Sequence, residues 1–260
     1  MNNEFSQKNI PLPRHPIEEI LADIGVYQNP DILLEEYQVH LATQNPNVKN
    51  LGVYYALLSN VRYAWHKTLR YESYFENFYP TNGKVEEIEA LNHHIHSYLE
   101  DMDIFKEKLD VLFGKIKNDV KSMATNKTEV VEFYKAAVGK NFEVFNGIST
   151  HRNPHHHDGM RFIDADLLKA ENARNERLMF QSEPFAGMIR PEKINAFIEK
   201  LKNEEGESFS TAKTKWIKTA KNNSEQTSAY LAETIGIIKP NLYLLLNIRP
   251  VKEVCGLLDK

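Results

Sequence analysis

One unbroken apolar stripe between residues 84 and 124 restricts the possible folds of this chain more than any other feature of its sequence. Its members recur every three or four residues, which is the spacing of one face of an α-helix. They are Ile88, Leu91, Ile95, Leu99, Met102, Phe105, Leu109, Leu112, Ile116, Val120 and Met123. A helix of this length spans about 60 Å. Other helices must cover its apolar face, so we predict a bundle of long antiparallel helices.

The rest of the chain also favours an all-α fold. The sequence holds only 11 glycines and 11 prolines, and long stretches contain neither. Capping residues and apolar spacings predict further helices. They cover residues 30–43, 48–79, 129–148 after Thr128, 165–180 after Asp164, 191–201, 208–221 and 225–235, with a break at 222–224. We expect a flexible arm at 1–16, a bundle at 17–183, and a smaller helical region at 184–260, either separate or part of the same domain.

Charge and cysteine content restrict the cellular setting. The net charge of -4 gives no general reason to expect nucleic acid or an anionic membrane as a partner. Cys255 is the single cysteine, so no intramolecular disulfide forms, which is typical of a reducing cytoplasm. We expect Cys255 to act as a small apolar filler. The most apolar run, Leu242 to Ile248, is too short to span a bilayer, so we expect no membrane partner.

The segment from Thr150 to Gly159 concentrates groups that transfer protons and bind anions. It contains four of the ten histidines together with Arg152 and Asp158. Pro154 and Gly159 prevent a plain helix there, so the backbone must turn among these side chains. Such a bend can bring Arg152 and His157 together, although five positions separate them in the sequence.

These residue types suit the cleavage of RNA without a metal. Arg152 offers a permanent charge with forked donors that match a phosphate. His157 can act as a base on a 2′-hydroxyl, and Asn153 can orient a phosphate oxygen or a ribose hydroxyl. We assign substrate binding to the remaining imidazoles, those of His151, His155 and His156.

The same residues resemble the Arg-x4–6-His motif of the HEPN superfamily. Arg152, the polar Asn153, three further residues and His157 match it, and the match extends over about residues 84–180 of a predicted helical bundle. The resemblance implies a homodimer whose two motifs face each other across a cleft, and a metal-independent endoribonuclease without a cofactor. It also implies RNA and an antitoxin-like protein as partners. The adjacent His155 and His156 leave open which imidazole takes the role of His157.

Two other interpretations of the segment stay open. His151, His155, His157 and Asp158 are possible metal ligands, and the spacing of His155 and His157 suits a loop. That arrangement would make the chain a metal-binding helical bundle protein. Alternatively, the segment is a polar loop between helices in a non-catalytic helical interaction protein.

A second histidine group, His93, His94 and His96, lies within the long predicted helix. At about 100° per residue, His93 points away from the apolar stripe, and the other two lie roughly 90–110° to either side of it. No pair has the i, i+4 spacing of a helical metal site. We therefore expect a solvated polar face rather than a metal site.

The region from 231 to 245 is similar to a helix-turn-helix pattern. Ala232, Gly236, Leu242 and Leu245 occupy the positions of its small residue, turn glycine and core residues. The second helix would offer mostly apolar side chains, which read bases poorly. We expect the region to pack against another helix, with DNA binding as the lesser alternative. The lysines at 213, 215, 218 and 221 suit phosphate contacts, and equally a solvated helix face.

Overall fold

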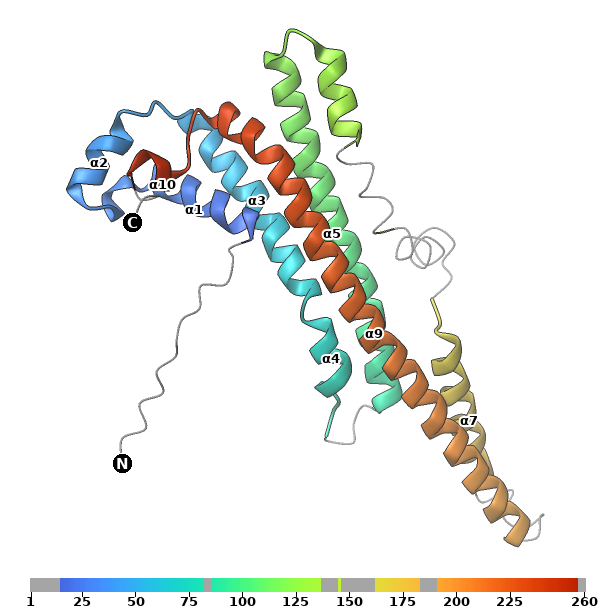
Figure 1. Cartoon of the computed structure of the whole chain (residues 1–260). Coiled ribbons are helices and arrows are strands. Elements are labelled where there is room, and N and C mark those ends of the chain that lie inside the picture. The colour runs from blue at the N-terminus through green and yellow to red at the C-terminus, as the bar shows by residue number, and fades with distance from the viewer. Residues whose placement is uncertain (1–14, 82–85, 137–144, 146–161, 183–190, 257–260) are drawn as a thin grey trace, which may run out of the picture. The chain divides into compact units, whose positions relative to one another are not determined.

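The computed structural model of the chain describes residues 15–81, 86–136, 145, 162–182 and 191–256. Every regular element in these ranges is a helix, which confirms the expected all-α class (Figure 1). None of the described helices is both long and apolar enough to cross a membrane.

The chain divides into two compact units. Unit 1 combines the described parts of Met1–Arg62, Asp110–Val138 and Ala229–Lys260. Unit 2 combines the described parts of Tyr63–Leu109 and Gly139–Ser228. Three long helices contribute residues to both units. They are α3 (Val48–Thr68), α5 (Glu87–Met123) and α9 (Pro191–Leu246).

Helix α5 follows the apolar stripe closely. The predicted helix of residues 84–124 is observed from Glu87 to Met123, and residues 82–85 lie outside the described part of the chain. Leu91, Leu109 and Ile116 have no exposed surface, as a stripe covered by other helices requires. A fully buried side chain of this size contributes about 1.5–3 kcal/mol to folding, so the stripe is a main source of stability.

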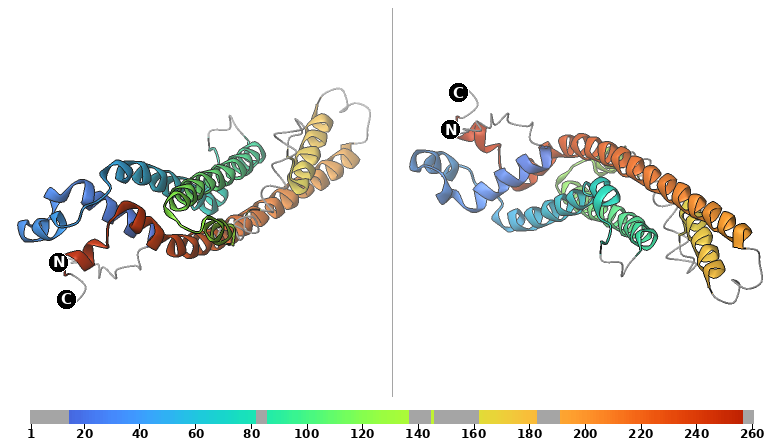
Figure 2. Two further views of the ribbon diagram at one scale, coloured as in Figure 1. Left: turned by 90° about the horizontal axis from the view of Figure 1, so that it is seen from above. Right: turned by 90° about the horizontal axis from the view of Figure 1, so that it is seen from below.

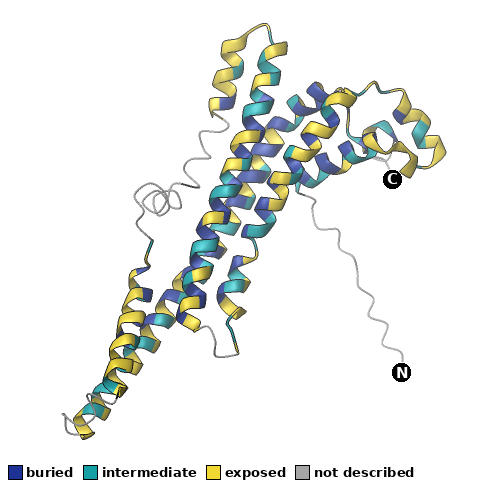
Figure 3. Cartoon of the chain, turned by 180° about the vertical axis from the view of Figure 1, so that it is seen from behind, coloured by how far each residue is buried: buried dark blue, intermediate teal, exposed yellow. Residues whose placement is uncertain are grey.

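In unit 1, helix α1 (Pro16–Gln28) secures the C-terminal part of the chain. The Tyr27 hydroxyl donates to the carbonyl oxygen of Arg249 at 3.1 Å. Asp23 accepts hydrogen bonds from the Tyr243 hydroxyl at 2.5 Å and from the backbone N–H of Val251 at 3.1 Å. Helix α10 (Val251–Val254) is thereby held near α1 and α2 (Glu35–Ala42), as Figures 1 and 2 show. Figure 3 shows α2 largely exposed, whereas α1 has a buried face.

In unit 2, aromatic rings and one buried carboxylate hold α5 against its neighbours. Asp101 of α5 accepts hydrogen bonds from Lys67 Nζ at 2.8 Å and from the Tyr71 hydroxyl at 2.7 Å. Tyr71 begins α4 (Tyr71–Asn77), whose Phe75 ring contacts Tyr98 of α5 with centroids 5.8 Å apart. Because Lys67 meets Asp101 while Phe75 meets Tyr98, the chain through α4 runs antiparallel to α5.

Two predicted helices in the first third of the chain are interrupted. The one expected at 48–79 divides into α3 and α4 after Thr68, whose hydroxyl bonds to the carbonyl of Trp65 and competes with the regular helix pattern there. The one expected at 30–43 divides into the 3-10 turn η1 (Pro30–Ile32) and α2. Asn29 makes no side-chain capping bond there, and the backbone of Leu33 is extended.

The ends of three other helices test the predicted boundaries. Pro16, the last residue assigned to the N-terminal arm, begins α1, and residues 1–14 lie outside the described part. Residues 127–136 are helical, but the cap is Asn126 rather than Thr128, because the Asn126 side chain accepts the N–H groups of residues 128 and 129. Asp164 caps α7 (Ala165–Gln181) as predicted.

The largest correction concerns α9. The predicted helices at 191–201, 208–221 and 225–235 are one continuous helix that reaches Leu246. The expected break at 222–224 is absent, because the Asn223 amide donates to the Tyr98 hydroxyl of α5 at 2.8 Å and so secures this turn of α9. The Asn223 side chain thus bonds to a neighbouring helix and does not end α9.

The helix-turn-helix pattern at 231–245 is also absent. Helix α9 continues through Gly236 and contains Pro240 in its interior, so there is no turn between two helices. Leu242 and Leu245 are buried, in agreement with the expectation that this region packs against other helices. Asn247, at a φ of 52°, ends the helix with the left-handed conformation that asparagine tolerates. Cys255 is buried as expected, and burial raises the pKa of its thiol.

Candidate functional site

The residues that the sequence predicts as catalytic lie outside the described part of the chain. These are Arg152, Asn153 and His157, and the same holds for His151, His155, His156 and Asp158. The structure therefore brings none of them together and separates none of them. What it does describe is the chain that follows them, from Phe162 into α7.

The chain after the segment is anchored by Asp164, whose side chain is 1% exposed. Its Oδ1 accepts the backbone N–H groups of Asp166 and Leu167, at 3.1 and 3.2 Å, and so caps α7. Its Oδ2 accepts Lys215 Nζ at 2.8 Å and Trp216 Nε1 at 3.0 Å, both from α9. One carboxylate thus joins the beginning of α7 to the middle of α9.

The charge of Asp164 is stabilised by this arrangement. Burial alone would raise the pKa of its carboxyl, because a charge is poorly solvated in the interior. The hydrogen bonds from Lys215, from the Leu167 backbone and from Trp216 outweigh burial and leave the pKa below its ordinary value. Asp164 is therefore a structural anion and does not serve as a proton donor near neutral pH.

Aromatic rings complete the anchor. The Phe162 ring packs edge-on against Trp216, with centroids 6.0 Å apart, and lies 6.4 Å from the ring of His96. Trp216 in turn contacts Phe75 and Tyr98. Asp164 and the half-buried Phe162 thus attach the chain after the candidate segment to unit 2, whereas Ile163 between them is exposed.

The second histidine group is more buried than predicted. His93 is exposed, as expected for a polar face. His94 and His96 are half-buried instead, and His94 Nε2 lies 2.7 Å from the carbonyl oxygen of Phe78. The His94 ring also contacts Tyr74, Phe75 and Tyr79. Within the described ranges, no three His, Cys, Asp or Glu side chains are grouped as metal ligands.

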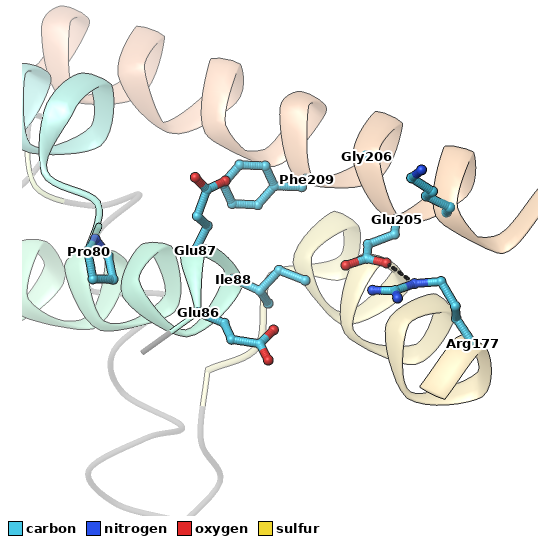
Figure 4. Close-up of a pocket in the computed structure, with 9 residues that line it drawn as sticks. Pro80, Glu86, Glu87, Ile88, Arg177, Glu205, Gly206 and Phe209 are labelled. Atoms are coloured by element: carbon cyan, nitrogen blue, oxygen red, sulfur yellow. Dashed lines mark hydrogen bonds and ion pairs between the residues drawn. The ribbon is translucent and has the colours of Figure 1, made fainter. Parts of the chain in front are cut away.

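A pocket of about 600 Å³ lies between the start of α5, α7 and the first part of α9 (Figure 4). Arg177 and Glu205 point toward each other in it and form an ion pair at 2.8 Å. Arg174, on the same helix as Arg177, pairs with the pocket residue Glu86 at 2.5 Å. Among the described residues that line it there is no Ser, Thr, Cys or His, so they supply no hydroxyl or thiol nucleophile and no imidazole base.

The ion pairs of this pocket position α7. Arg177 meets Glu205, Lys169 meets Glu204 at 3.4 Å, and the rings of Phe180 and Phe197 lie 5.1 Å apart. Together with the Asp164–Lys215 pair, these contacts show that α7 runs antiparallel to α9. The pocket thus lies where these helices pack together. Its Arg177 pairs with Glu205, and its Glu86 pairs with Arg174.

The sequence did not reveal the link between Asp164 and α9. Asp164 was recognised as a helix cap, but its second oxygen meets residues that follow 51 and 52 positions later. The local signal that remains is a lysine beside a tryptophan, Lys215-Trp216, in the middle of a helix. That pair alone does not indicate which acidic residue it contacts.

Comparison with known proteins adds no assignment. The sequence matches no protein family and no curated protein, and the structure matches no solved structure.

Proposed function

We propose that this protein is a metal-independent endoribonuclease or RNA-binding protein of the HEPN type. Arg152, Asn153 and His157 are its active residues, and His151, His155 and His156 contact the RNA. The active form is a cytoplasmic homodimer with the two motifs across a cleft, and an antitoxin-like protein is a further partner. An all-helical fold with the motif between two helices is the setting that this function requires.

One observation carries the proposal. The chain that follows the motif is fixed in unit 2 by Asp164, which binds Lys215 and Trp216 of α9. Precise placement of catalytic groups requires support from rigid elements. Here the support is a buried carboxylate only seven positions after His157 in the sequence. The side chain of Lys215 is 52% exposed, so one edge of this support reaches the solvent.

The proposed reaction transfers a phosphoryl group within the RNA. His157 removes the proton of a 2′-hydroxyl, and the resulting oxygen attacks the adjacent phosphorus. Arg152 stabilises the charge that develops on the phosphoryl oxygens. A neighbouring imidazolium donates a proton to the departing 5′-oxygen. The products are a 2′,3′-cyclic phosphate and a 5′-hydroxyl, and no metal takes part in any step.

A cleavage assay tests this proposal. Unstructured RNA is incubated in EDTA with the wild type, Arg152→Ala and His157→Ala, with His93→Ala as the matched control at an exposed histidine. We expect cleavage by the wild type and the control, and a loss of about 100-fold or more in each of the other two. His155→Ala and His156→Ala identify which imidazole is the base.

Other outcomes would contradict the proposal in distinct ways. Cleavage that persists in both Arg152→Ala and His157→Ala excludes the site. Activity that requires an added divalent metal favours the alternative site of His151, His155, His157 and Asp158. A wild type that neither binds nor cleaves RNA rejects the function altogether.

A second candidate function is that of a non-catalytic helical interaction protein. It is favoured by apolar side chains that unit 1 exposes in and around η1 and α2. Ile32 is 70% exposed, Leu34 67% and Val39 64%. Exposed apolar residues that lie close together are typical of protein contact surfaces.

A further inference from the structure

Four lysines of α9 lie in a stretch without acidic residues, between Glu207 and Glu225. Residues 208–224 contain four lysines and neither Asp nor Glu. The preceding stretch of the same helix, residues 191–207, mixes both signs. Its acidic residues are Glu192, Glu199, Glu204, Glu205 and Glu207. Positive charge is therefore concentrated on a few turns in the middle of α9.

The burial pattern shows that this positive charge faces the solvent. Ala212, Trp216 and Ala220 are buried and mark the side of α9 that faces the interior of unit 2. At about 100° per residue, Lys218 and Lys221 lie on the opposite side, and both are exposed. We refer to the exposed residues Thr214, Lys215, Lys218, Lys221 and Asn222 as the lysine face.

The lysine face is bordered by side chains with defined contacts. On one flank, Lys215 binds Asp164 at 2.8 Å. On the other, Lys213 Nζ lies 4.2 Å from the centre of the Tyr79 ring. By contrast, Lys218 and Lys221 form no ion pair with any acidic side chain of the described ranges. Within the described ranges no acidic side chain pairs with this positive charge, so it is available to an anionic ligand.

The polar residues of the face distinguish between anionic partners. Thr214 and Asn222 lie among the lysines and offer hydroxyl and amide groups that bind phosphate and sugar oxygens. A helix that lies on a membrane surface needs exposed apolar residues next to its lysines, and the lysine face has none. The face therefore suits a nucleic-acid backbone better than a lipid surface.

We propose that the lysine face of α9 binds the phosphate backbone of single-stranded RNA. The choice of RNA rests on the proposed function, because Asp164, which follows the His157 segment, contacts the edge of this face through Lys215. From Lys215 to Lys221 the face extends about 9 Å along the helix axis. Its lysines hold the RNA backbone by charge, without sequence preference.

Salt-dependent binding to a defined RNA tests this inference. The probe is a fluorescein-labelled 20-nucleotide oligouridine in EDTA, and anisotropy is followed from 50 to 200 mM NaCl. All proteins are the full chain with His157→Ala, so the probe is not cleaved. Lys218→Gln/Lys221→Gln is compared with Lys193→Gln/Lys200→Gln. The control changes two exposed lysines of the same helix in its mixed-charge stretch.

Each lost phosphate contact on a single strand lowers the slope of log K against log salt by about 0.7. We therefore expect Lys218→Gln/Lys221→Gln to reduce the slope by about 1.4 and the affinity by roughly 25-fold at 0.1 M salt. The control should change the affinity by less than about threefold. Circular dichroism checks that α9 is intact. If the double variant loses helicity, Lys218→Gln and Lys221→Gln are measured singly, with about 0.7 expected for each.

Three results would overturn the inference. They are equal losses in the two double variants, no RNA binding by the His157→Ala protein at 50 mM salt, and binding to phosphatidylserine vesicles instead of RNA. The cleavage assay distinguishes this failure from failure of the proposed function. Normal cleavage by His157→Ala in the otherwise wild-type chain, together with lost binding in Lys218→Gln/Lys221→Gln, rejects the active residues and supports the lysine face. Lost cleavage in His157→Ala, together with unchanged binding in Lys218→Gln/Lys221→Gln, rejects only the lysine face.

Discussion

The indole of Trp216 donates a hydrogen bond to the carboxylate of Asp164 across 3.0 Å, although 52 positions separate the two residues in the sequence. The same oxygen accepts Lys215, and the other oxygen accepts two backbone N–H groups of α7. Asp164 thus acts at once as a helix cap, as half of an ion pair and as the acceptor for a buried indole.

Replacing Asp164 by Asn should destabilise the protein. The amide lacks the negative charge, and it can accept through only one atom, so either the α7 cap or the Trp216 indole loses its partner. We expect the free energy of unfolding to fall by about 2–4 kcal/mol, measured by urea denaturation. Glu176→Gln, at an exposed position of the same helix, should change it by less than about 0.5 kcal/mol. Equal effects of both substitutions would reject this role of Asp164.

The contribution of Asp164 to stability should be lost at acidic pH. Because the pKa of this carboxyl is lowered in the folded state, its contribution is fully present above the unfolded-state pKa of about 3.9. It is lost as pH falls through the folded-state value. The difference in unfolding free energy between the wild type and Asp164→Asn should therefore be constant from pH 7 to about pH 5 and shrink below about pH 4. A difference that instead grows on acidification would contradict the lowered pKa.

Gly236→Ala should stabilise the protein. Gly236 is exposed within α9, and an added Cβ would meet no atom within 4 Å. Alanine in a helix interior is favoured over glycine by about 1 kcal/mol, so the free energy of unfolding should rise by that amount. A turn at Gly236, as a helix-turn-helix requires, would give the opposite sign.

Gly256→Ala provides a matched comparison for that substitution. Gly256 has a φ of +64°, a conformation that residues with a side chain rarely adopt, and space around it is likewise open. The same chemical change should therefore lower the free energy of unfolding by about 1 kcal/mol. Urea denaturation of both variants gives a difference in sign that depends only on backbone conformation.

Buried tyrosines should make the protein sensitive to alkali. Burial raises the pKa of Tyr98 to about 12, although a hydrogen bond from Asn223 partly opposes this. Above pH 10 the unfolded chain ionises this phenol while the folded protein keeps it protonated, so stability falls as pH rises. Tyr98→Phe should reduce the slope between pH 10 and 11 by up to about 1.4 kcal/mol per pH unit. Tyr63→Phe, at a position that is 68% exposed, is the control.

The helices that sequence alone predicted well have a strong local cause. The stripe of α5 repeats without interruption, so its limits fall within three residues of those expected. Asp164 precedes α7 with the side chain that a helix start prefers, and the helix begins there. In both cases neighbouring residues determine the structure.

The parts that sequence alone missed depend on distant contacts. Asn223 is a poor helix former by itself, but its bond to the Tyr98 hydroxyl, from another helix, retains it within α9. Leu231, Ile235 and Leu242 are fully buried, and their packing carries α9 past the residues that suggested its end. The candidate segment from Thr150 to Gly159 lies outside the described ranges, so its chemistry stays a prediction.

The makeup of unit 1 has a consequence for synthesis of the protein. Its three parts come from the beginning, the middle and the end of the chain, and Tyr27 bonds to a residue 222 positions later. A ribosome releases α1 long before its bonding partners Tyr243, Arg249 and Val251 exist. Unit 1 therefore closes only after the part that begins at residue 229 has been synthesised, and until then α1 lacks its bonds to these residues. Unlike a helix of a sequentially continuous domain, α1 thus completes its contacts only with residues that are translated as many as 228 positions after it.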